Sequence, residues 1–428
     1  MSFIRPGIEQ SGGSGLAAPA AVRREGARLV RAGFIPLVDA AVLIAAAEYG
    51  FAAREGLQLE LARDVSWANI RDRLAFRQFD IAHMLAPMPV ASMLGLGSNP
   101  SPAIAPFSLG RGGNAITLSV DLYRRMQAKA GLTGDEDALT NARALKRVID
   151  ETRQNGEPLP VIGMTYPFSS HNYELRYWLA AGGIHPDFDV KLVVVPPPMS
   201  SDALSAGVID GFCVGAPWNM VAVSRGVGRI VAVKEDIWPS SPEKVIGMRP
   251  DWAEQNPETV ARLIVALDRA AAWCDVSANR PILAEMLAQQ RFVDAPIDIL
   301  TNVLLGKFVT DPVGTERTVQ GYFSFHRDAA NFPWVSQAEW IFSQMVRWGQ
   351  VPYTRAGAEN ARLAFRPDLY RNAVAGSLLL PENDVRIEGG TNDGFIDGAV
   401  FDGTQIPAYL ARFDIRAATA SPDQIEEL

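Results

Sequence analysis

The chain of 428 residues has only two cysteines and four histidines. Cys213 and Cys274 form no C-x-x-C pair, which argues against a zinc finger and against a disulfide framework. The histidines form no H-E-x-x-H or His-x-His pattern, so we expect no metal, and no cofactor motif is present. A phosphate-binding G-x-x-x-x-G-K-[ST] segment is also missing, so we do not expect an ATPase subunit.

Basic runs and long hydrophobic runs are missing as well. The formal net charge is -8, which argues against a nucleic-acid surface. The longest apolar run, "AAVLIAAA" at 40–47, is too short to span a bilayer. The first residues are rich in Gly, Ser, Ala and Pro and do not read as a signal peptide. We therefore expect a disordered tail over 1–27 and a cytoplasmic protein, with a periplasmic location as the alternative.

From residue 28, segments typical of strands and helices alternate. Expected strands are 27–37, 57–63, 79–85, 159–166, 190–198, 209–215 and 228–238. Expected helices are 40–50, 67–78, 87–97, 120–129, 138–154, 171–183, 217–227, 250–275, 279–290, 296–306 and 337–348. Such alternation indicates an α/β fold with mainly parallel sheets.

Two segments are predicted to carry the chain between two lobes. One is the Gly-interrupted stretch 103–120, and the other is the strand at 228–238. They divide the chain into lobe 1, residues 28–112 and 239–428, and lobe 2, residues 113–238. Two lobes joined in this way can hinge about a cleft.

Some residues at predicted helix starts are candidates for ligand contact. Ser170 and His171 stand where free backbone N–H groups favour an anion, although serine there is also a plain helix cap. Pro217 and Trp218 begin another helix, and Trp67 begins a third. Each tryptophan is either a pocket wall or a core residue.

Other candidates have equally open interpretations. Lys244 lies between apolar segments and could neutralise an anion, or it is a surface lysine. His83 and Met84 end a strand ahead of two prolines, on the rim of a cleft or in the core. "GRGGNA" at 110–115 fits a loose dinucleotide pattern, but a strand-like segment follows where a helix is needed. No catalytic constellation stands out, which favours a binding protein over an enzyme.

Several blocks together resemble one known family. They are "GFIPLVDAAVLIAAAEYGF", "FDIAHMLAPMPVA", "RYWLAAGGIHPD", "GFCVGAPWN", "EKVIGMRPDW" and "FDGTQIPAYLARFDI". The combination, over roughly residues 28 to 415, is similar to the nitrate/bicarbonate substrate-binding family of ABC transporters (NrtA/CmpA type). The resemblance implies a type II periplasmic-binding-protein fold, in which two α/β lobes joined by two crossing strands enclose a small oxyanion.

The resemblance also implies ligand positions. Lys244 and His171 match the cationic residue and the helix-start histidine. Gly110 and Asn114 match a glycine and a side-chain amide four residues later, with asparagine where the family pattern has glutamine. Met84 stands where nitrate transporters have a tryptophan, with His83 before it.

The remaining implied contacts are walls and neighbours of the ligand. They are Trp67, Trp218, Pro217 and Ser170. Nitrate is planar and carries three acceptor oxygens, so a lysine, a histidine, an amide and backbone N–H groups suit it. Nitrate, nitrite and bicarbonate stay open as alternatives.

Three functions follow as hypotheses. Transporter members are exported, and the apparent lack of a leader points to the cytoplasmic branch, the NasS-type nitrate/nitrite sensors. Such a sensor would hold a NasT-like antiterminator of ANTAR type and release it when anion binds. The alternative is a substrate-binding component of a nitrate, nitrite or bicarbonate transporter. A pyrimidine-forming enzyme of the same fold is the third, and its cysteine-rich motif is absent.

Overall fold

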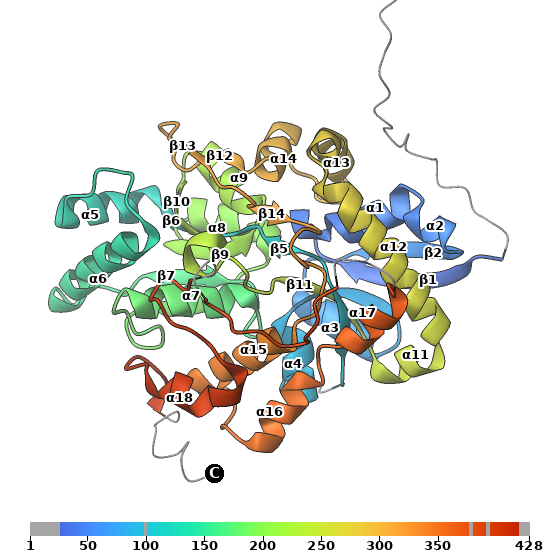
Figure 1. Cartoon of the computed structure of the whole chain (residues 1–428). Coiled ribbons are helices and arrows are strands. Elements are labelled where there is room, and N and C mark those ends of the chain that lie inside the picture. Colours follow the sequence, from blue (N-terminus) through green and yellow to red (C-terminus); the bar gives the residue numbers. More distant parts are fainter. Residues whose placement is uncertain (1–25, 98–100, 376–379, 391–393, 419–428) are drawn as a thin grey trace, which may run out of the picture.

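The computed structural model describes residues 26–97, 101–375, 380–390 and 394–418. The expected tail over 1–27 lies outside the described residues, apart from Gly26 and Ala27. Two five-stranded sheets form the centres of two α/β lobes that lie side by side (Figure 1). No described helix has both the length and the apolar character needed to cross a membrane.

The first sheet, the centre of lobe 1, has the order β2-β1-β3-β11-β4. Its strands are β1 Arg28–Phe34, β2 Leu57–Arg63, β3 Ile81–Leu85, β4 Ile104–Ser108 and β11 Lys244–Met248. Strand β1 is parallel to β2 and β3, whereas β11 runs antiparallel to both β3 and β4. The helices around it are η1 Val38–Ala40, α1 Ala41–Glu48, α2 Phe51–Arg54, α3 Trp67–Ala75, α4 Pro87–Met93, α11 Pro250–Gln255, α12 Pro257–Asp275, η3 Ser277–Asn279, α13 Arg280–Leu287 and α14 Ile297–Leu304.

The second sheet, the centre of lobe 2, has the order β10-β6-β9-β7-β8. Its strands are β6 Asn114–Ser119, β7 Val161–Met164, β8 Lys191–Val194, β9 Gly211–Gly215 and β10 Gly228–Val233. Its helices are α5 Val120–Ala130, α6 Ala138–Gln154, α7 Ser170–Ala181, η2 Pro197–Met199, α8 Ser200–Ser205, α9 Trp218–Ser224 and α10 Lys234–Ile237.

Side-chain caps fix several helix starts where the sequence predicts them. Ser66 Oγ accepts the Asn69 backbone N–H at 3.4 Å and begins α3, and Ser169 Oγ accepts that of Asn172 at 3.0 Å and begins α7. The strand expected at 228–238 is shorter, because Asp236 accepts the Val233 N–H at 2.9 Å and closes the helical turn α10. That turn directs Lys234 away from the path of a strand.

The chain passes twice between the lobes. The first passage runs from β4 through β5 Arg111–Gly112 to β6, and β5 pairs with β14 Phe323–Ser324. The second runs through α10 and the loop to Lys244, and not along a strand as expected, because β10 ends in the second sheet. Both passages lie beside the cleft between the lobes.

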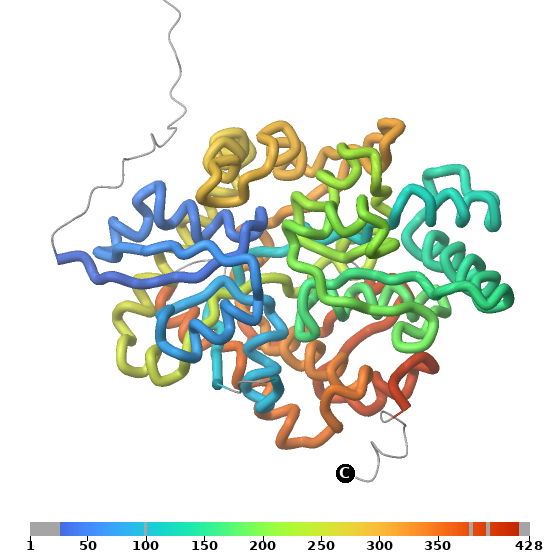
Figure 2. The backbone as a smooth tube through the Cα atoms, turned by 180° about the vertical axis from the view of Figure 1, so that it is seen from behind, coloured from blue at the N-terminus to red at the C-terminus, as the bar shows by residue number. Residues whose placement is uncertain are grey.

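The C-terminal part of the chain contacts both lobes. After the hairpin β12 Lys307–Val309 and β13 Glu316–Thr318 come α15 Val335–Arg347, α16 Arg355–Arg362, α17 Pro367–Ala373, η4 Gly403–Gln405 and α18 Ile406–Ala411. Figure 1 shows α15, α16 and α18, in orange and red, below the two sheets, and Figure 2 shows the same part of the chain from behind. Tyr173 of lobe 2 donates a hydrogen bond to Gln350 at 2.6 Å, and α15 and α16 pack on α4 of lobe 1. The segment 335–415 therefore joins the lobes on one side.

Candidate functional site

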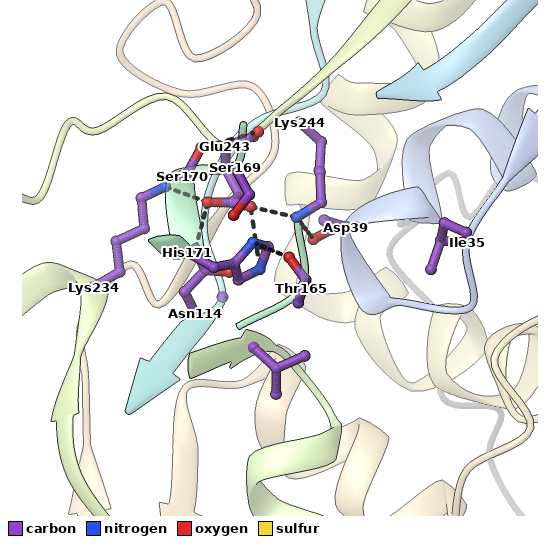
Figure 3. A network of polar contacts seen from close by, with 12 residues as sticks. Ile35, Asp39, Asn114, Thr165, Ser169, Ser170, His171, Lys234, Glu243 and Lys244 are labelled. Atoms are coloured by element: carbon purple, nitrogen blue, oxygen red, sulfur yellow. Dashed lines mark hydrogen bonds and ion pairs between the residues drawn. The ribbon is translucent and has the colours of Figure 1, made fainter. Parts of the chain in front are cut away.

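Eight polar side chains meet in the cleft between the lobes, and we call them the cleft cluster. They come from η1, β3, β6, α7, α10, β11 and the loop before β11, and all are buried. Figure 3 shows six of them, Asp39, Asn114, His171, Lys234, Glu243 and Lys244. The members are Asp39, His83, Asn114, His171, Glu174, Lys234, Glu243 and Lys244. Lobe 1 supplies the end of the cluster at Asp39, and lobe 2 supplies the helix α7.

Lys244 is the cation on the lobe 1 side of the cluster. Its Nζ lies 2.8 Å from Asp39 Oδ2, contacts the carboxylate of Glu243, and lies 5.7 Å from the centroid of the Trp67 ring. Lys244 is the first residue of β11 and pairs with Leu85 at the end of β3, so the sheet fixes where this side chain begins.

His83 contacts the second carboxylate oxygen of Asp39. Its Nε2 lies 3.0 Å from Asp39 Oδ1, while the Ile35 backbone N–H donates to its Nδ1 at 3.3 Å. Because Nδ1 accepts a hydrogen bond, the neutral ring carries its proton on Nε2, facing Asp39. Its ring also contacts the edge of Trp67, with centroids 5.4 Å apart.

Glu243 lies at the centre of the cluster. Its carboxylate contacts Lys244, lies 2.9 Å from Lys234 Nζ and accepts a hydrogen bond from Asn114 Nδ2. Glu174 contacts the same lysine and the same amide. Its carboxylate lies 3.2 Å from Lys234 Nζ and accepts hydrogen bonds from Asn114 Nδ2 at 2.9 Å and from Ser241 Oγ at 2.8 Å. The two carboxylates thus share one lysine and one amide.

His171 reaches the cluster from the first turn of α7. Its Nδ1 lies 3.1 Å from Thr165 Oγ1, and its Nε2 lies 3.5 Å from Glu243 Oε1. That Nε2, like Asn114 Oδ1, has no hydrogen-bond partner within the described part of the chain. A hydroxyl proton donated by Thr165 to Nδ1 would place the imidazole N–H on Nε2, pointing into the cleft.

Burial and ion pairing set the protonation states of Asp39, Lys244 and His83, at the lobe 1 end of the cluster. Burial raises the pKa of Asp39, but Lys244 and the hydrogen bond from His83 outweigh this, and the pKa is below its ordinary value. Burial lowers the pKa of Lys244, yet Asp39 and Glu243 raise it above its ordinary value. This end of the cluster is therefore an ionised pair. Burial keeps His83 neutral by lowering its pKa.

The pKa values of the two glutamates are shifted in opposite directions. Burial raises the pKa of both, but the ammonium groups of Lys234 and Lys244 bring the pKa of Glu243 well below its ordinary value. The pKa of Glu174 stays raised, since burial and the negative charge of Glu243 outweigh Lys234. Burial also lowers the pKa of His171 to about 3, so this ring is neutral at physiological pH. The cluster thus combines cationic and neutral N–H donors with carboxylates.

The structure brings together many of the candidate residues. Lys244, His171, Asn114 and His83 belong to the cleft cluster. Gly110, with a φ of +123°, lines a narrow pocket with Asp39 and Glu243.

Three other candidates lie around the cluster. Ser170 Oγ donates to Pro242 O at 2.8 Å and so holds the loop that carries Glu243. Trp218 Nε1 donates to Pro36 O at 3.2 Å, which joins lobe 2 to the loop before Asp39. Pro217 follows a cis peptide bond in the same turn.

Met84 is not brought into the cluster. Neighbouring side chains of a strand point to opposite faces, so Met84 faces away from His83. Met84 approaches Gly247 so closely that a Cβ there would lie 2.1 Å from its sulfur. It also lines a small cavity with Arg71 and Met88.

Several residues in and beside the cluster carry no sequence pattern that marks them for ligand binding. Asp39 reads as a helix cap, Lys234 as part of a strand, and Glu174 and Thr165 as ordinary helix and strand residues. Glu243 is the neighbour of Lys244 in "SSPEK", which was the one available hint. The sequence also gives no sign of Gly215, which lies against the cluster. A Cβ at this position would lie 3.3 Å from Asp39 Oδ2 and 3.4 Å from Asn114 Oδ1.

The chemistry of the site is that of hydrogen bonding and charge. Lys234, Lys244, His171 and Asn114 direct N–H groups to the buried carboxylate of Glu243, and a donor set that surrounds one anionic oxygen group also suits an oxyanion. Over the residues that the structure describes, no group of three or more His, Cys, Asp and Glu residues is arranged to hold a metal ion.

Comparisons with known sequences agree on one family. A sequence model described as the NMT1-like family matches residues 24–288. The chain is 36% identical over 403 residues to the nitrate import ATP-binding protein NrtC of Synechocystis; the match covers 92% of this chain but only 57% of NrtC. It is 32% identical over 406 residues to the nitrate/nitrite binding protein NrtA of Synechococcus elongatus, covering 91% of this chain and 87% of NrtA.

A solved structure gives the same picture. The crystal structure of the periplasmic nitrate-binding protein NrtA from Synechocystis superposes with a TM-score of 0.82 at 29% identity. The superposition covers 91% of this chain and 99% of that protein. The similarity therefore extends over both lobes and the C-terminal segment.

Proposed function

Because this chain belongs to the NMT1-like family, and within it to the nitrate/bicarbonate substrate-binding proteins, we propose that it is the anion-binding component of an import system of the ABC type. Its fold is that of the periplasmic binding proteins, as the sequence resemblance implies. The proposal rests on one observation: the N–H groups of Lys244, Lys234, His171 and Asn114 converge between the lobes on one buried anionic group, the carboxylate of Glu243.

Nitrate or nitrite is the ligand that we propose first. The relative from Synechococcus elongatus is described as a nitrate/nitrite binding protein, and the described donors suit planar oxygens. In this proposal Lys244 supplies the charge, while His171 and Asn114 supply directed hydrogen bonds. Gly110 lines the pocket, and Trp67 covers the lysine from the lobe 1 side.

Calorimetry of the purified chain tests this function. We expect one molecule of nitrate or nitrite to bind per chain, and chloride, which is spherical, to bind far more weakly. Bicarbonate binding in place of nitrate would change the ligand and keep the function. If none of the three oxyanions bound, the proposal would be wrong.

The sensor hypothesis gives the same cleft a regulatory role. In it, a cytoplasmic chain holds a NasT-like antiterminator and releases it when anion binds. The relatives above are nitrate-binding and nitrate-import proteins, and one is described as periplasmic, so they favour the import role. Co-purification with a NasT-like protein that nitrate disrupts would favour the sensor, and no complex at any nitrate concentration would remove it.

A further inference from the structure

Glu243 takes up the contacts that a bound anion would need. Its carboxylate meets Lys234 at 2.9 Å, Lys244, Asn114 Nδ2, and His171 Nε2 at 3.5 Å. These are the donors that the proposed function assigns to nitrate. Figure 3 shows the carboxylate between the two lysines, with dashed lines to its partners.

The backbone of Glu243 is held on both sides of the cleft. The Ala86 N–H of lobe 1 donates to Glu243 O at 2.9 Å, and Ser170 Oγ of lobe 2 donates to the preceding carbonyl at 2.8 Å. The side chain is therefore presented to the donors by a fixed loop. The pocket lined by Asp39, Gly110, Glu243 and Lys244 leaves no space large enough for a water molecule. In this arrangement the Glu243 carboxylate fills the place that an oxyanion would take beside these donors.

The charges of the cluster also oppose a further anion. Its three carboxylates, Asp39, Glu174 and Glu243, face only two ammonium groups, Lys234 and Lys244. A monoanion would share these cations with Glu243, and a like charge beside a carboxylate raises its pKa. Bound anion and ionised Glu243 are therefore mutually unfavourable, and the effect is reciprocal.

The groups that face Glu243 come from several elements. They are Asp39 of η1, His83 of β3, His171 and Glu174 of α7, Cys213 of β9, Lys234 of α10 and Lys244 of β11. Lys234 and Lys244 contact Glu243 directly, and among the acidic groups Glu174 shares the most partners with it, namely Lys234 and Asn114.

We propose that Glu243 is an internal counter-anion that occupies the place of the ligand in the free protein, and that an oxyanion binds together with one proton. The proton comes from solvent and adds to a carboxylate oxygen of the Glu174–Glu243 pair. No other bond is made or broken. The inference rests on the proposed function, and it makes anion affinity rise as the pH falls.

Calorimetry of wild type with nitrate, in buffers of different ionisation enthalpy between pH 6 and 8, counts the protons. We expect uptake of about one proton per nitrate and an affinity that rises about tenfold for each unit of pH decrease. Glu243→Gln keeps the size of the side chain and removes its charge, leaving Asp39 and Glu174 to balance the two lysines. We expect this variant to bind nitrate at least tenfold more tightly at pH 8, with proton uptake close to zero.

Glu339→Gln is the matched control, because Glu339 is a buried glutamate that pairs with Arg362 outside the cleft. It should keep the wild-type affinity and proton uptake. Nitrate binding by wild type without proton uptake would overturn the inference and leave the function standing. So would weaker binding by Glu243→Gln, or proton uptake that persists in that variant. No binding of any anion by either chain would overturn both.

Discussion

Lys244 Nζ lies 2.8 Å from Asp39 Oδ2, although the two residues are 205 positions apart in the chain. Both side chains are almost fully buried, and Glu243 and His83 hold the outer sides of the pair. The pair therefore joins the turn before α1 to the start of β11, where the chain re-enters the first sheet. It fixes the cation that the proposed function needs.

Lys244→Ala should abolish measurable nitrate binding and also destabilise the protein. Removing one partner of a buried ion pair leaves an uncompensated carboxylate, which costs about 3–5 kcal/mol. Calorimetry measures the affinity, and urea unfolding measures the free energy of unfolding. Lys307→Ala, an exposed lysine on β12, should change neither.

A double variant separates binding from folding. Asp39→Asn with Lys244→Met removes both charges of the pair, so the free energy of unfolding should recover most of the loss. Nitrate binding should stay absent. Restored binding in this variant, or unchanged affinity in Lys244→Ala, would remove Lys244 from the anion site.

Thr165→Val tests the hydrogen bond that orients His171. Thr165 Oγ1 lies 3.1 Å from His171 Nδ1, and valine keeps the shape of threonine without its hydroxyl. Without this partner the ring can carry its proton on Nδ1 and present an acceptor to the cleft. We expect about fivefold weaker nitrate binding, since a buried hydrogen bond contributes ~1 kcal/mol.

The control for this variant is Thr117→Val. Thr117 is also buried, and its hydroxyl donates to Asn219 at 2.7 Å on the far side of β6. The control should lose stability and keep the affinity. Equal affinities of the two variants would mean that Thr165 acts only on the fold.

Local patterns were sufficient to predict much of the fold. The helix over 138–154 and the strand over 57–63 have the expected bounds, because a cap at Asp137 and a clear two-residue alternation are encoded in neighbouring residues. The strand at 228–238 was predicted too long, because the cap that Asp236 gives to Val233 depends on a turn that a short apolar run does not reveal.

The candidate site was predictable only in part. Lys244 and His171 are candidates from the local sequence, each with a plain structural alternative, and the family resemblance adds Asn114; the structure places the three within one cluster. Asp39 and Glu174 carry no local mark of their role, since their partners are distant in the sequence. Such contacts depend on how the sheets pair, for example on β11 entering the first sheet between β3 and β4.

Burial of His171 predicts a pH-dependent difference in stability between wild type and His171→Gln. Burial lowers the pKa of His171 to about 3 in the folded protein, whereas an unfolded histidine titrates near 6.5. Below pH ~6.5 the unfolded chain therefore binds a proton that the folded chain does not, and stability falls as the pH falls. Wild type should lose ~2 kcal/mol relative to His171→Gln between pH 7.5 and 5.0.

The comparison must be made between the two chains and not on wild type alone. Burial raises the pKa of Glu235 to about 8 and that of Glu174 above its ordinary value, and both effects raise stability as the pH falls. These terms are common to both chains and cancel in the difference. Urea unfolding at several pH values measures it, and a difference that is flat down to pH 5.0 would show that the ring accepts a proton in the folded state.

The Gly-rich passage between the lobes predicts that Gly112 tolerates no side chain. Its φ is +90°, and a Cβ would lie 1.9 Å from the carbonyl oxygen of Tyr322, which directly precedes β14, the strand that pairs with β5. Gly112→Ala should therefore cost well over ~2 kcal/mol, because the conformational strain adds to the loss of this pairing. Gly131→Ala is the control: its φ is +70° at the end of α5, with open space around it, so only the strain of ~1 kcal/mol applies. Urea unfolding should show a clearly larger loss of unfolding free energy for Gly112→Ala than for Gly131→Ala. Similar losses would mean that β14 moves to make room for the side chain, and that this contact does not hold the passage in place.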